Sequence, residues 1–129
     1  MEKIRRNHTD ISPAGPSMSR TVRAGSLLFI AGCTARGSDA QGKPLMDQLA
    51  VTLDRITRIV AAEGGTPGDI VKITTFVTSI PDWRAHGTEQ VELFTKYFEG
   101  QFPANSLIEI SALAEPGLDV EIEAMAELS

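Results

Sequence analysis

The chain has 129 residues, of which 42% are hydrophobic and 22% charged, a balance typical of one soluble globular domain. Its 12 basic residues against 17 acidic ones give a net charge of −5, which argues against a nucleic-acid partner because it would repel the phosphate backbone. No apolar run approaches the roughly 20 residues that span a bilayer, and the polar first residues lack the apolar core of a secretory signal. We therefore expect a single domain over residues 1–129, located in the cytoplasm and without a membrane partner.

The sequence offers no residues with the spacing of a disulfide or a metal site. Cys33 is the single cysteine, and a lone cysteine agrees with a reducing compartment. The two histidines, His8 and His86, lie far apart and near no cysteine or pair of acids spaced as metal ligands. The sequence therefore predicts no bound metal.

The chain begins with a polar segment, and the Pro-Ala-Gly-Pro sequence at 13–16 predicts a loop after it. The one dense basic run is interpreted as part of a mobile, solvated N-terminus and comprises Lys3, Arg5 and Arg6. A strand pair is predicted at 19–24 and 27–32, joined by Gly25-Ser26 as a hairpin turn. The second of these strands is apolar without alternation, which predicts cover by a helix on one face and by another chain on the other.

Residues 33–44 are rich in glycine and small polar residues and predict an exposed loop. From Leu45 apolar residues recur every three or four positions, which predicts a helix that stops at Gly64-Gly65. The polar positions between them are expected on the solvent side of that helix: Asp47, Gln48, Asp54, Arg55 and Arg58.

The next segment, 69–78, is rich in β-branched residues and predicts a strand. The residues expected on one face of that strand are Val71, Ile73, Thr75 and Val77. A second helix is predicted at 82–99, with Gly100 as its stop signal. Its inward stripe is expected to consist of Val91, Phe94 and Phe98.

The clearest strand signal lies at the C-terminal end, where apolar residues occupy nearly every second position from Leu118 to Leu128. That period is typical of a strand with one face in the core. Another strand is predicted at 101–110. The opposite face of the last strand carries four acids, a pattern found most often on a solvated face, namely Asp119, Glu121, Glu123 and Glu127.

The predicted order of elements is strand, strand, helix, strand, helix, strand, strand. Connections this short place both helices on one face of a single mixed sheet, which predicts an α+β fold in the form of a two-layer sandwich. The other face would still expose the apolar strand at 27–32 and the side chain of Phe76. Self-association through that face, in a ring of like subunits, is the simplest way to cover it.

The sequence contains no phosphate loop, no dinucleotide-binding glycine pattern and no Gly-x-Ser-x-Gly elbow. Five other segments carry more information: Gly15-Pro16, Ala31-Gly32, 68–77, Phe102-Pro103-Ala104-x-Ser106 and 120–126. In register from about residue 13 to 127, they resemble the Rid family of reactive-intermediate deaminases, also called the YjgF family. Membership implies a chorismate-mutase-like fold, a homotrimer and three pockets, each at the junction of two subunits.

The resemblance also implies a chemistry, the hydrolysis of small enamines and imines to a carbonyl compound and ammonia, without a cofactor. In the deaminase branch an arginine holds the substrate carboxylate; the matching residue here is Asn105, which offers donors but no charge. The family glutamate that positions or activates the attacking water is matched by Glu121, which would act as a general base. The other substrate-binding positions that the resemblance assigns are Gly32, Cys33 and four that depart from the residues usual in that branch, Ser17, Ala31, Gly87 and Leu107.

Three functions stay open. The first is an enamine or imine deaminase of a divergent branch, with Glu121 handling water and Asn105 bonding a substrate oxygen. The second is a non-catalytic trimer that binds or senses a small molecule, because a site without its arginine keeps its shape but loses its anchor. The third, a ribonuclease activity ascribed to some relatives, is disfavoured by the net charge of −5 and the lack of a basic stripe.

Three further side chains have two interpretations each. Cys33 follows Ala31-Gly32, where a thiol at the pocket mouth would bind or attack an electrophile, but it is also interpreted as a small, inert filler. Arg20 and Arg23 lie on the first strand with side chains on opposite faces, so at most one supplies the missing positive charge. Surface exposure is the expectation for both arginines.

Overall fold

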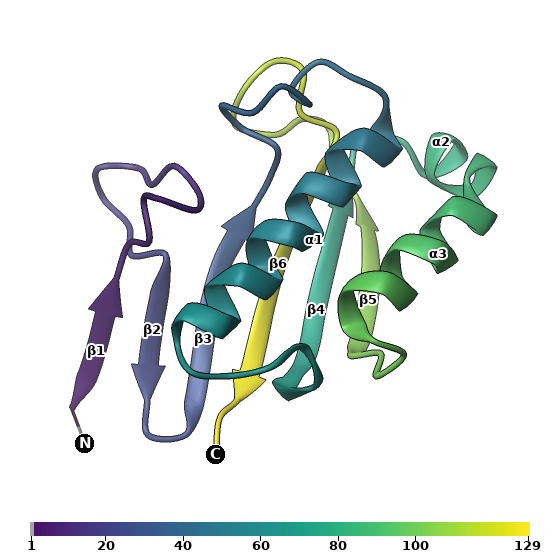
Figure 1. Ribbon diagram of the computed structural model, residues 1–129. Coiled ribbons are helices and arrows are strands. Elements are labelled where there is room, and N and C mark those ends of the chain that lie inside the picture. The colour runs from purple at the N-terminus through teal and green to yellow at the C-terminus, as the bar shows by residue number, and fades with distance from the viewer. Residues whose placement is uncertain (1) are drawn as a thin grey trace.

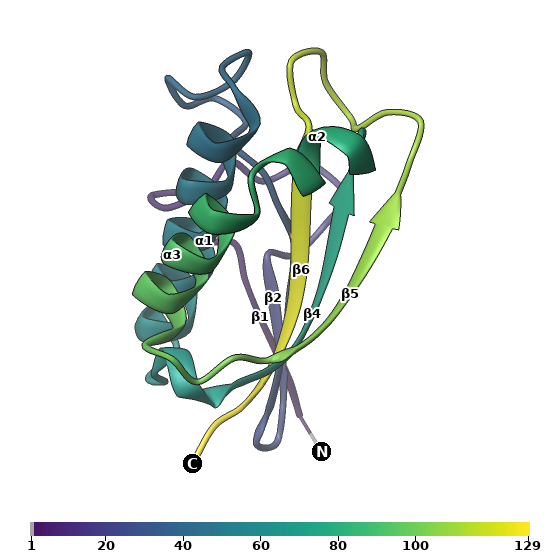
Figure 2. The ribbon, with the colours of Figure 1, turned by 90° about the vertical axis from the view of Figure 1, so that its right-hand side faces the viewer.

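The computed structural model describes residues 2–129, which form a mixed sheet of six strands with helices packed on one face (Figures 1 and 2). The elements in chain order are β1 (Lys3–Arg6), β2 (Thr21–Ala24), β3 (Leu27–Cys33), α1 (Leu45–Ala62), the short helix η1 (Pro67–Asp69), β4 (Ile70–Val77), α2 (Ile80–Ala85), α3 (Gly87–Phe98), β5 (Ala104–Glu109) and β6 (Val120–Glu127). This arrangement confirms the α+β, two-layer architecture predicted from the sequence. We call the sheet face that carries no helices the open face.

Strand β6 lies inside the sheet although it comes last in the chain. The strand order is β1-β2-β3-β6-β4-β5, with β4 and β5 parallel and the other neighbours antiparallel. Because helices cover only one face, the side chains of an inner strand alternate between the core and the open face. The predicted alternation of β6 is confirmed: the buried side chains are Val120, Ile122, Ala124 and Ala126, and the chain positions between them are open to solvent or half-buried.

Helix α1 packs on the sheet through its apolar face, with Leu49, Leu53 and Ile56 fully buried. The predicted helix is confirmed, but the expectation that its polar residues all face solvent is wrong for Gln48 and Arg55, which are buried. Their polar groups are satisfied by loop backbone instead of water. Gln48 Nε2 donates to the carbonyls of Lys43 and Gly117, 2.8 and 3.0 Å away, and Arg55 Nη1 donates to those of Thr34 and Arg36, 2.7 and 2.9 Å away.

The second predicted helix is divided into α2 and α3 at His86, whose φ of −116° is not helical. The following residue, Gly87, is a weak helix former, which favours a break at this point. Within α3 the predicted inward stripe is confirmed for Phe94 and Phe98 but wrong for Val91, which is exposed because it borders an open hollow beside β5.

A β-bulge in β4 changes the predicted faces of that strand. The register with β6 shifts between Ile70 and Lys72, and the extra residue turns the Val71 side chain outward. Val71 is therefore exposed and Ile70 buried, against expectation, while Ile73, Thr75 and Val77 are buried. In β3 the burial alternates, with Leu28 and Ile30 in the core and Leu27 and Phe29 on the open face. The predicted helix cover of β3 is confirmed, and cover by another chain stays a prediction.

The N-terminus is not the irregular segment expected from its sequence, because residues 3–6 form the edge strand β1. The end of β1 and the residues just after it are held to the end of α1 by Glu63, whose side chain is buried. Arg6 Nη1 lies 2.9 Å from Glu63 Oε1 and His8 Nε2 lies 2.5 Å from Oε2. Thr21 Oγ1 also donates to Oε2, over 3.2 Å. These contacts with Glu63 order the N-terminal segment, and the polar sequence of that segment does not predict them.

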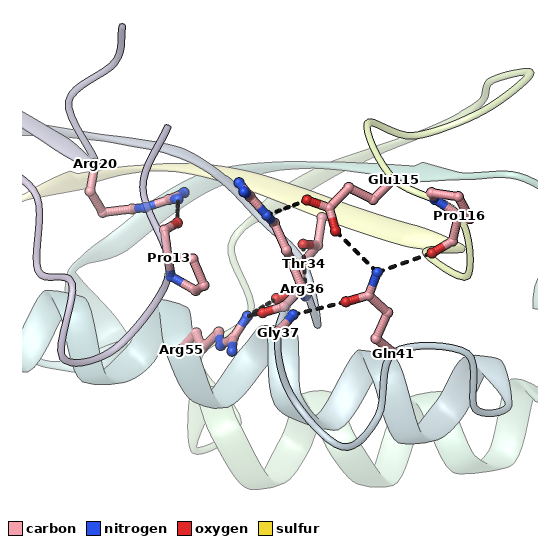
Figure 3. A network of polar contacts seen from close by, with 9 residues as sticks. All are labelled: Pro13, Arg20, Thr34, Arg36, Gly37, Gln41, Arg55, Glu115 and Pro116. Atoms are coloured by element: carbon pink, nitrogen blue, oxygen red, sulfur yellow. Dashed lines mark hydrogen bonds and ion pairs between the residues drawn. The ribbon is translucent and has the colours of Figure 1, made fainter. Parts of the chain in front are cut away.

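The loops after β3 and before β6 are joined by side chains (Figure 3). Arg36 Nε and Glu115 Oε2 form an ion pair of 2.5 Å, and Gln41 Nε2 donates to the Pro116 carbonyl over 3.0 Å. Gln41 also accepts from the Gly37 amide over 2.9 Å. Together with Arg55 these contacts hold the ends of β3 and β6 in one position. None of the helices in residues 2–129 is both long and apolar enough to cross a membrane.

Candidate functional site

The Glu121 carboxylate lies on the open face, directly beside Gly32 of β3. Val120 and Ile122, its neighbours in β6, are buried under the helices, so the half-buried Glu121 side chain points to the opposite side. A Cβ atom added at Gly32 would lie 2.6 Å from Glu121 Cδ, closer than real Cβ contacts allow. The missing side chain of Gly32 is therefore what leaves room for this carboxylate.

A register shift in β3 separates Gly32 from Cys33. The pairing with β6 is irregular between Ile30 and Cys33, and Cys33 pairs with Ile122 on the core side, where it is fully buried. The bulge turns the Cys33 thiol into the core, so the interpretation of Cys33 as a small, inert filler agrees with the structure and its expected place at the mouth of a pocket is wrong. Burial also raises the pKa of the thiol, which keeps it protonated and unreactive.

Arg20, just before β2, is the residue near Glu121 that sequence reasoning misplaced. It is 3% exposed, and its Nη1 donates to the carbonyls of Gly32 and Ala31, 2.6 and 3.2 Å away. Its Nη2 donates to the Pro13 carbonyl over 2.7 Å (Figure 3). Surface exposure is thus the wrong expectation for Arg20. The sequence contained one signal of this burial. Arg20 is two residues before Val22 and therefore shares its strand face, and the apolar Val22 is half-buried in the structure.

The electrostatics of the site depend on three groups. Burial raises the pKa of Glu121 above its usual value, the Arg20 guanidinium opposes that rise, and the Glu123 carboxylate adds to it. A carboxylate whose pKa is raised by burial is a better proton acceptor than one in water, and such groups are common at catalytic sites.

Asn105 lies elsewhere, on the edge strand β5. It pairs with Ile73 of β4, and its Oδ1 accepts a hydrogen bond from Thr75 Oγ1 over 3.0 Å. Its side chain borders a hollow of about 360 Å³ between β5 and the two shorter helices, α2 and α3. The other lining residues are mostly apolar: Ile73, Trp83, Gln90, Val91, Phe94, Phe102 and Pro103.

The structure gathers only some of the predicted site residues within one chain. Ala31, Gly32 and Glu121 lie together, and Ala31 also borders a shallow hollow of about 430 Å³ on the open face with Phe29, Thr74, Glu123 and Met125. Ser17 is exposed in the loop before β2, and Gly87 is exposed at the start of α3 with open space around its Cα.

Asn105 and Glu121 are on different sides of the sheet. In the register of β4, Asn105 pairs with the buried Ile73, whereas Glu121 pairs with Phe76. Leu107 is two residues beyond Asn105 and pairs with the buried Thr75, so it shares the face of Asn105. A single chain therefore does not bring Asn105 or Leu107 to the carboxylate of Glu121.

Comparisons with known proteins agree with this fold over its whole length. The model of the family described as endoribonuclease L-PSP matches residues 8–128. A RutC family protein of Pyrococcus horikoshii is 31% identical over 117 residues, which cover 88% of each chain. An Escherichia coli protein named as a candidate reactive intermediate deaminase, TdcF, is 29% identical over 133 residues, covering 98% of this chain and 97% of its own.

Solved structures give the same result. A Mycobacterium tuberculosis member of the YjgF/YER057c/UK114 family superposes with a TM-score of 0.77 at 31% identity, covering 98% of this chain and 100% of its own. A Rid family protein of unknown function from Yersinia pestis superposes with a TM-score of 0.83 at 26% identity, with the same coverage. The chain therefore belongs to the Rid family, which is also known as the YjgF/YER057c/UK114 or L-PSP family.

Proposed function

We propose that the protein hydrolyses a small enamine or imine to a carbonyl compound and ammonia, in a pocket between the subunits of a homotrimer. The observation that carries this proposal is the half-buried carboxylate of Glu121, set against a glycine on the open face with its pKa raised by burial. The name of the TdcF relative, a candidate reactive intermediate deaminase, supports the same reaction class.

The chemistry requires one group that first accepts and then donates a proton. Glu121 takes a proton from water as the water oxygen attacks the carbon of the protonated C=N bond, which gives a neutral carbinolamine. The protonated Glu121 gives that proton to the amino group and then accepts the hydroxyl proton as the C–N bond breaks, which forms the carbonyl compound and frees ammonia. Glu121 returns to its ionised form by passing the proton to the departing ammonia, which leaves as ammonium. General-base help of this kind is worth roughly 10²–10⁴-fold in rate.

A second subunit is needed because Asn105 and Glu121 lie on different sides of the sheet in one chain. The open face also exposes apolar side chains: Phe29 is 39% and Met125 37% exposed, and these residues pair across β3 and β6. We propose that this face packs on another copy of the chain, whose β5 edge brings its own Asn105 toward Glu121.

In this arrangement Asn105 holds an oxygen of the substrate. Its Oδ1 is engaged by Thr75, which leaves the amide N–H groups as donors. The hollow beside it contains no charged side chain among its lining residues, so it suits the apolar part of a substrate better than a second carboxylate.

The second candidate function is a trimer that binds a small molecule without turning it over. It is favoured by one observation, the amide at position 105 in place of the charged group that would anchor a carboxylate. The two candidates differ in what they require of Glu121, since binding alone does not need a proton acceptor.

The test compares Glu121→Gln with a control, Glu127→Gln, because Glu127 lies on the same strand but is exposed. Imines are generated from a panel of amino acids by an amino-acid oxidase, and hydrolysis is followed with and without each variant. Loss of turnover in Glu121→Gln, with Glu127→Gln close to wild type, is the expected result. Equal, small losses in both variants, or no turnover of any imine by the wild type, would favour the binding function.

A further inference from the structure

Arg20 is a buried cation that no carboxylate neutralises directly. Three backbone carbonyls accept hydrogen bonds from its Nη atoms, those of Pro13, Ala31 and Gly32. Within residues 2–129 its Nε finds no partner, and no acid there forms an ion pair with it. Burying a charge is costly unless opposite charge balances it. Carbonyl oxygens carry only a partial negative charge, so the distance of the nearby acids affects how well the buried Arg20 charge is balanced.

Gly32 connects this cation to the site. The Gly32 carbonyl accepts the 2.6 Å hydrogen bond from Arg20 Nη1. The Glu121 carboxylate packs against the Gly32 Cα, where a side chain would otherwise lie. The same Nη1 also bonds Ala31, so it holds both residues of the β3 bulge that turns Gly32 toward Glu121. A guanidinium suits this task because its fixed fork of donors engages several oxygens at once.

The charged and titratable groups around Glu121 come from three elements. Arg20 approaches from the residue before β2, Glu123 stands on β6 itself, and the buried Cys33 lies behind on β3. From β4 the facing residue is Phe76, which does not titrate. Among these groups Arg20 is the cation, and it acts against both burial and the like charge of Glu123.

We propose that Arg20 is a positioning residue of this site: its guanidinium fixes the β3 bulge against which Glu121 packs and places a buried positive charge at the Gly32 carbonyl. The proposal rests on the function proposed above, in which Glu121 acts as the base. Arg20 does not touch the substrate, because it is buried beneath the bulge.

The test is a titration of the Glu121 carboxyl carbon by ¹³C NMR, with the signal assigned by its absence in Glu121→Gln. The midpoint is compared in the wild type, Arg20→Gln, Arg20→Lys and the control Arg23→Gln. Arg23 lies on the same strand but donates to the Gly25 and Glu63 carbonyls. We expect a shift to higher pH in Arg20→Gln only, with Arg20→Lys near the wild type because it keeps the charge.

A second measurement leaves Arg20 in place, in case Arg20→Gln does not fold. The ¹⁵N signal of Arg20 Nε should change with the midpoint of Glu121 in the wild type, and that change should disappear in Glu121→Gln. The proposal would be overturned by an unshifted midpoint in folded Arg20→Gln, or by an Nε signal that does not change as Glu121 titrates. Arg20 would then be a purely structural residue.

Neither titration needs a substrate, so the two proposals fail separately. An inactive protein whose Glu121 midpoint still follows Arg20 would contradict the deaminase function and leave the coupling of the two residues standing. An active enzyme whose midpoint ignores Arg20 would contradict only the role assigned to Arg20. In an active enzyme, the acid limb of the pH–rate profile of Arg20→Gln should move in the same direction as the NMR midpoint.

Discussion

The carboxyl group of Glu121 occupies the space that a side chain at Gly32 would need. A Cβ at position 32 would stand 2.6 Å from Glu121 Cδ and 2.9 Å from its Cγ. These are atoms of a flexible side chain, so a larger residue at position 32 would displace the carboxylate without disrupting the sheet. The pair therefore links a backbone feature of β3 to the placement of the proposed base.

Gly32→Ala is expected to reduce turnover strongly while the fold survives. A displacement of about 1 Å in a catalytic group costs on the order of 10²-fold in rate, so kcat/KM should fall by about that factor. Thermal melting checks the fold. Thr95→Ala is the control, because Thr95 lies on the exposed side of α3 and the change should leave both activity and stability near the wild type. Equal activity of the two variants would show that Glu121 is not the base.

The trimer is tested on the open face. Phe29→Glu would place a charge beside Met125, and an unpaired charge in an apolar interface is costly. Light scattering after size exclusion should give three times the 13.9 kDa chain mass for the wild type and a lower mass for this variant. Thr95→Glu on the exposed side of α3 is the control. A wild-type monomer at micromolar concentration would contradict the trimer and, with it, a pocket built from two chains.

Local sequence patterns predicted most of the fold. The features that they did not predict depend on contacts between residues far apart in the chain. The alternation of β6 and the apolar stripe of α1 are visible in the sequence because each side of these elements has one constant environment. The burial of Gln48 and Arg55 is not visible, since their partners are carbonyls of distant loops. The β4 bulge at Val71 also lacks a sequence signal, because it inserts one residue into an otherwise regular pattern.

The candidate site was predictable only in part for the same reason. Resemblance to the family identified Glu121 and Gly32, which the structure brings together. It also identified Asn105, but the register of β4 with its two neighbours places Asn105 on the side of the buried Ile73 and Glu121 on the open face. The environment of Arg20 depends on Pro13 and Gly32, which are brought to it by a loop and a bulge. No local pattern contains that information.

Small imino acids should be poor substrates of the wild type and better substrates of Asn105→Arg. A charge-assisted hydrogen bond to a carboxylate is worth roughly 1.5–3 kcal/mol, or about one to two powers of ten in rate constant. The measurement is ammonia release from the enamine and imine product of threonine dehydratase. Asn105→Lys is the control, since it adds the charge without the fork. If the wild type already equals Asn105→Arg, another residue holds the carboxylate.

Glu63→Gln should destabilise the fold without touching the proposed site. The Glu63 side chain is 1% exposed and engages Arg6 and His8, and buried polar groups left without partners cost about 1–3 kcal/mol. Urea unfolding at a fixed protein concentration should show a loss of this size, reduced somewhat because Arg6 is half exposed. Glu92→Gln, on the exposed side of α3, should have no effect. Equal stabilities would mean that pairing with β2 alone holds β1.

Turnover should decline as the pH falls, because Glu121 must be ionised to accept a proton. Burial raises the pKa of Glu121 and Glu123 raises it further, so the acid limb of kcat/KM should lie above the ordinary glutamate pKa of about 4.3. Glu123→Gln removes the like charge and should move the limb to lower pH, whereas Glu127→Gln should leave it in place. Ammonia release, corrected at each pH for spontaneous hydrolysis, gives the profile. A limb that does not respond to Glu123→Gln would assign the titrating base to a group other than Glu121.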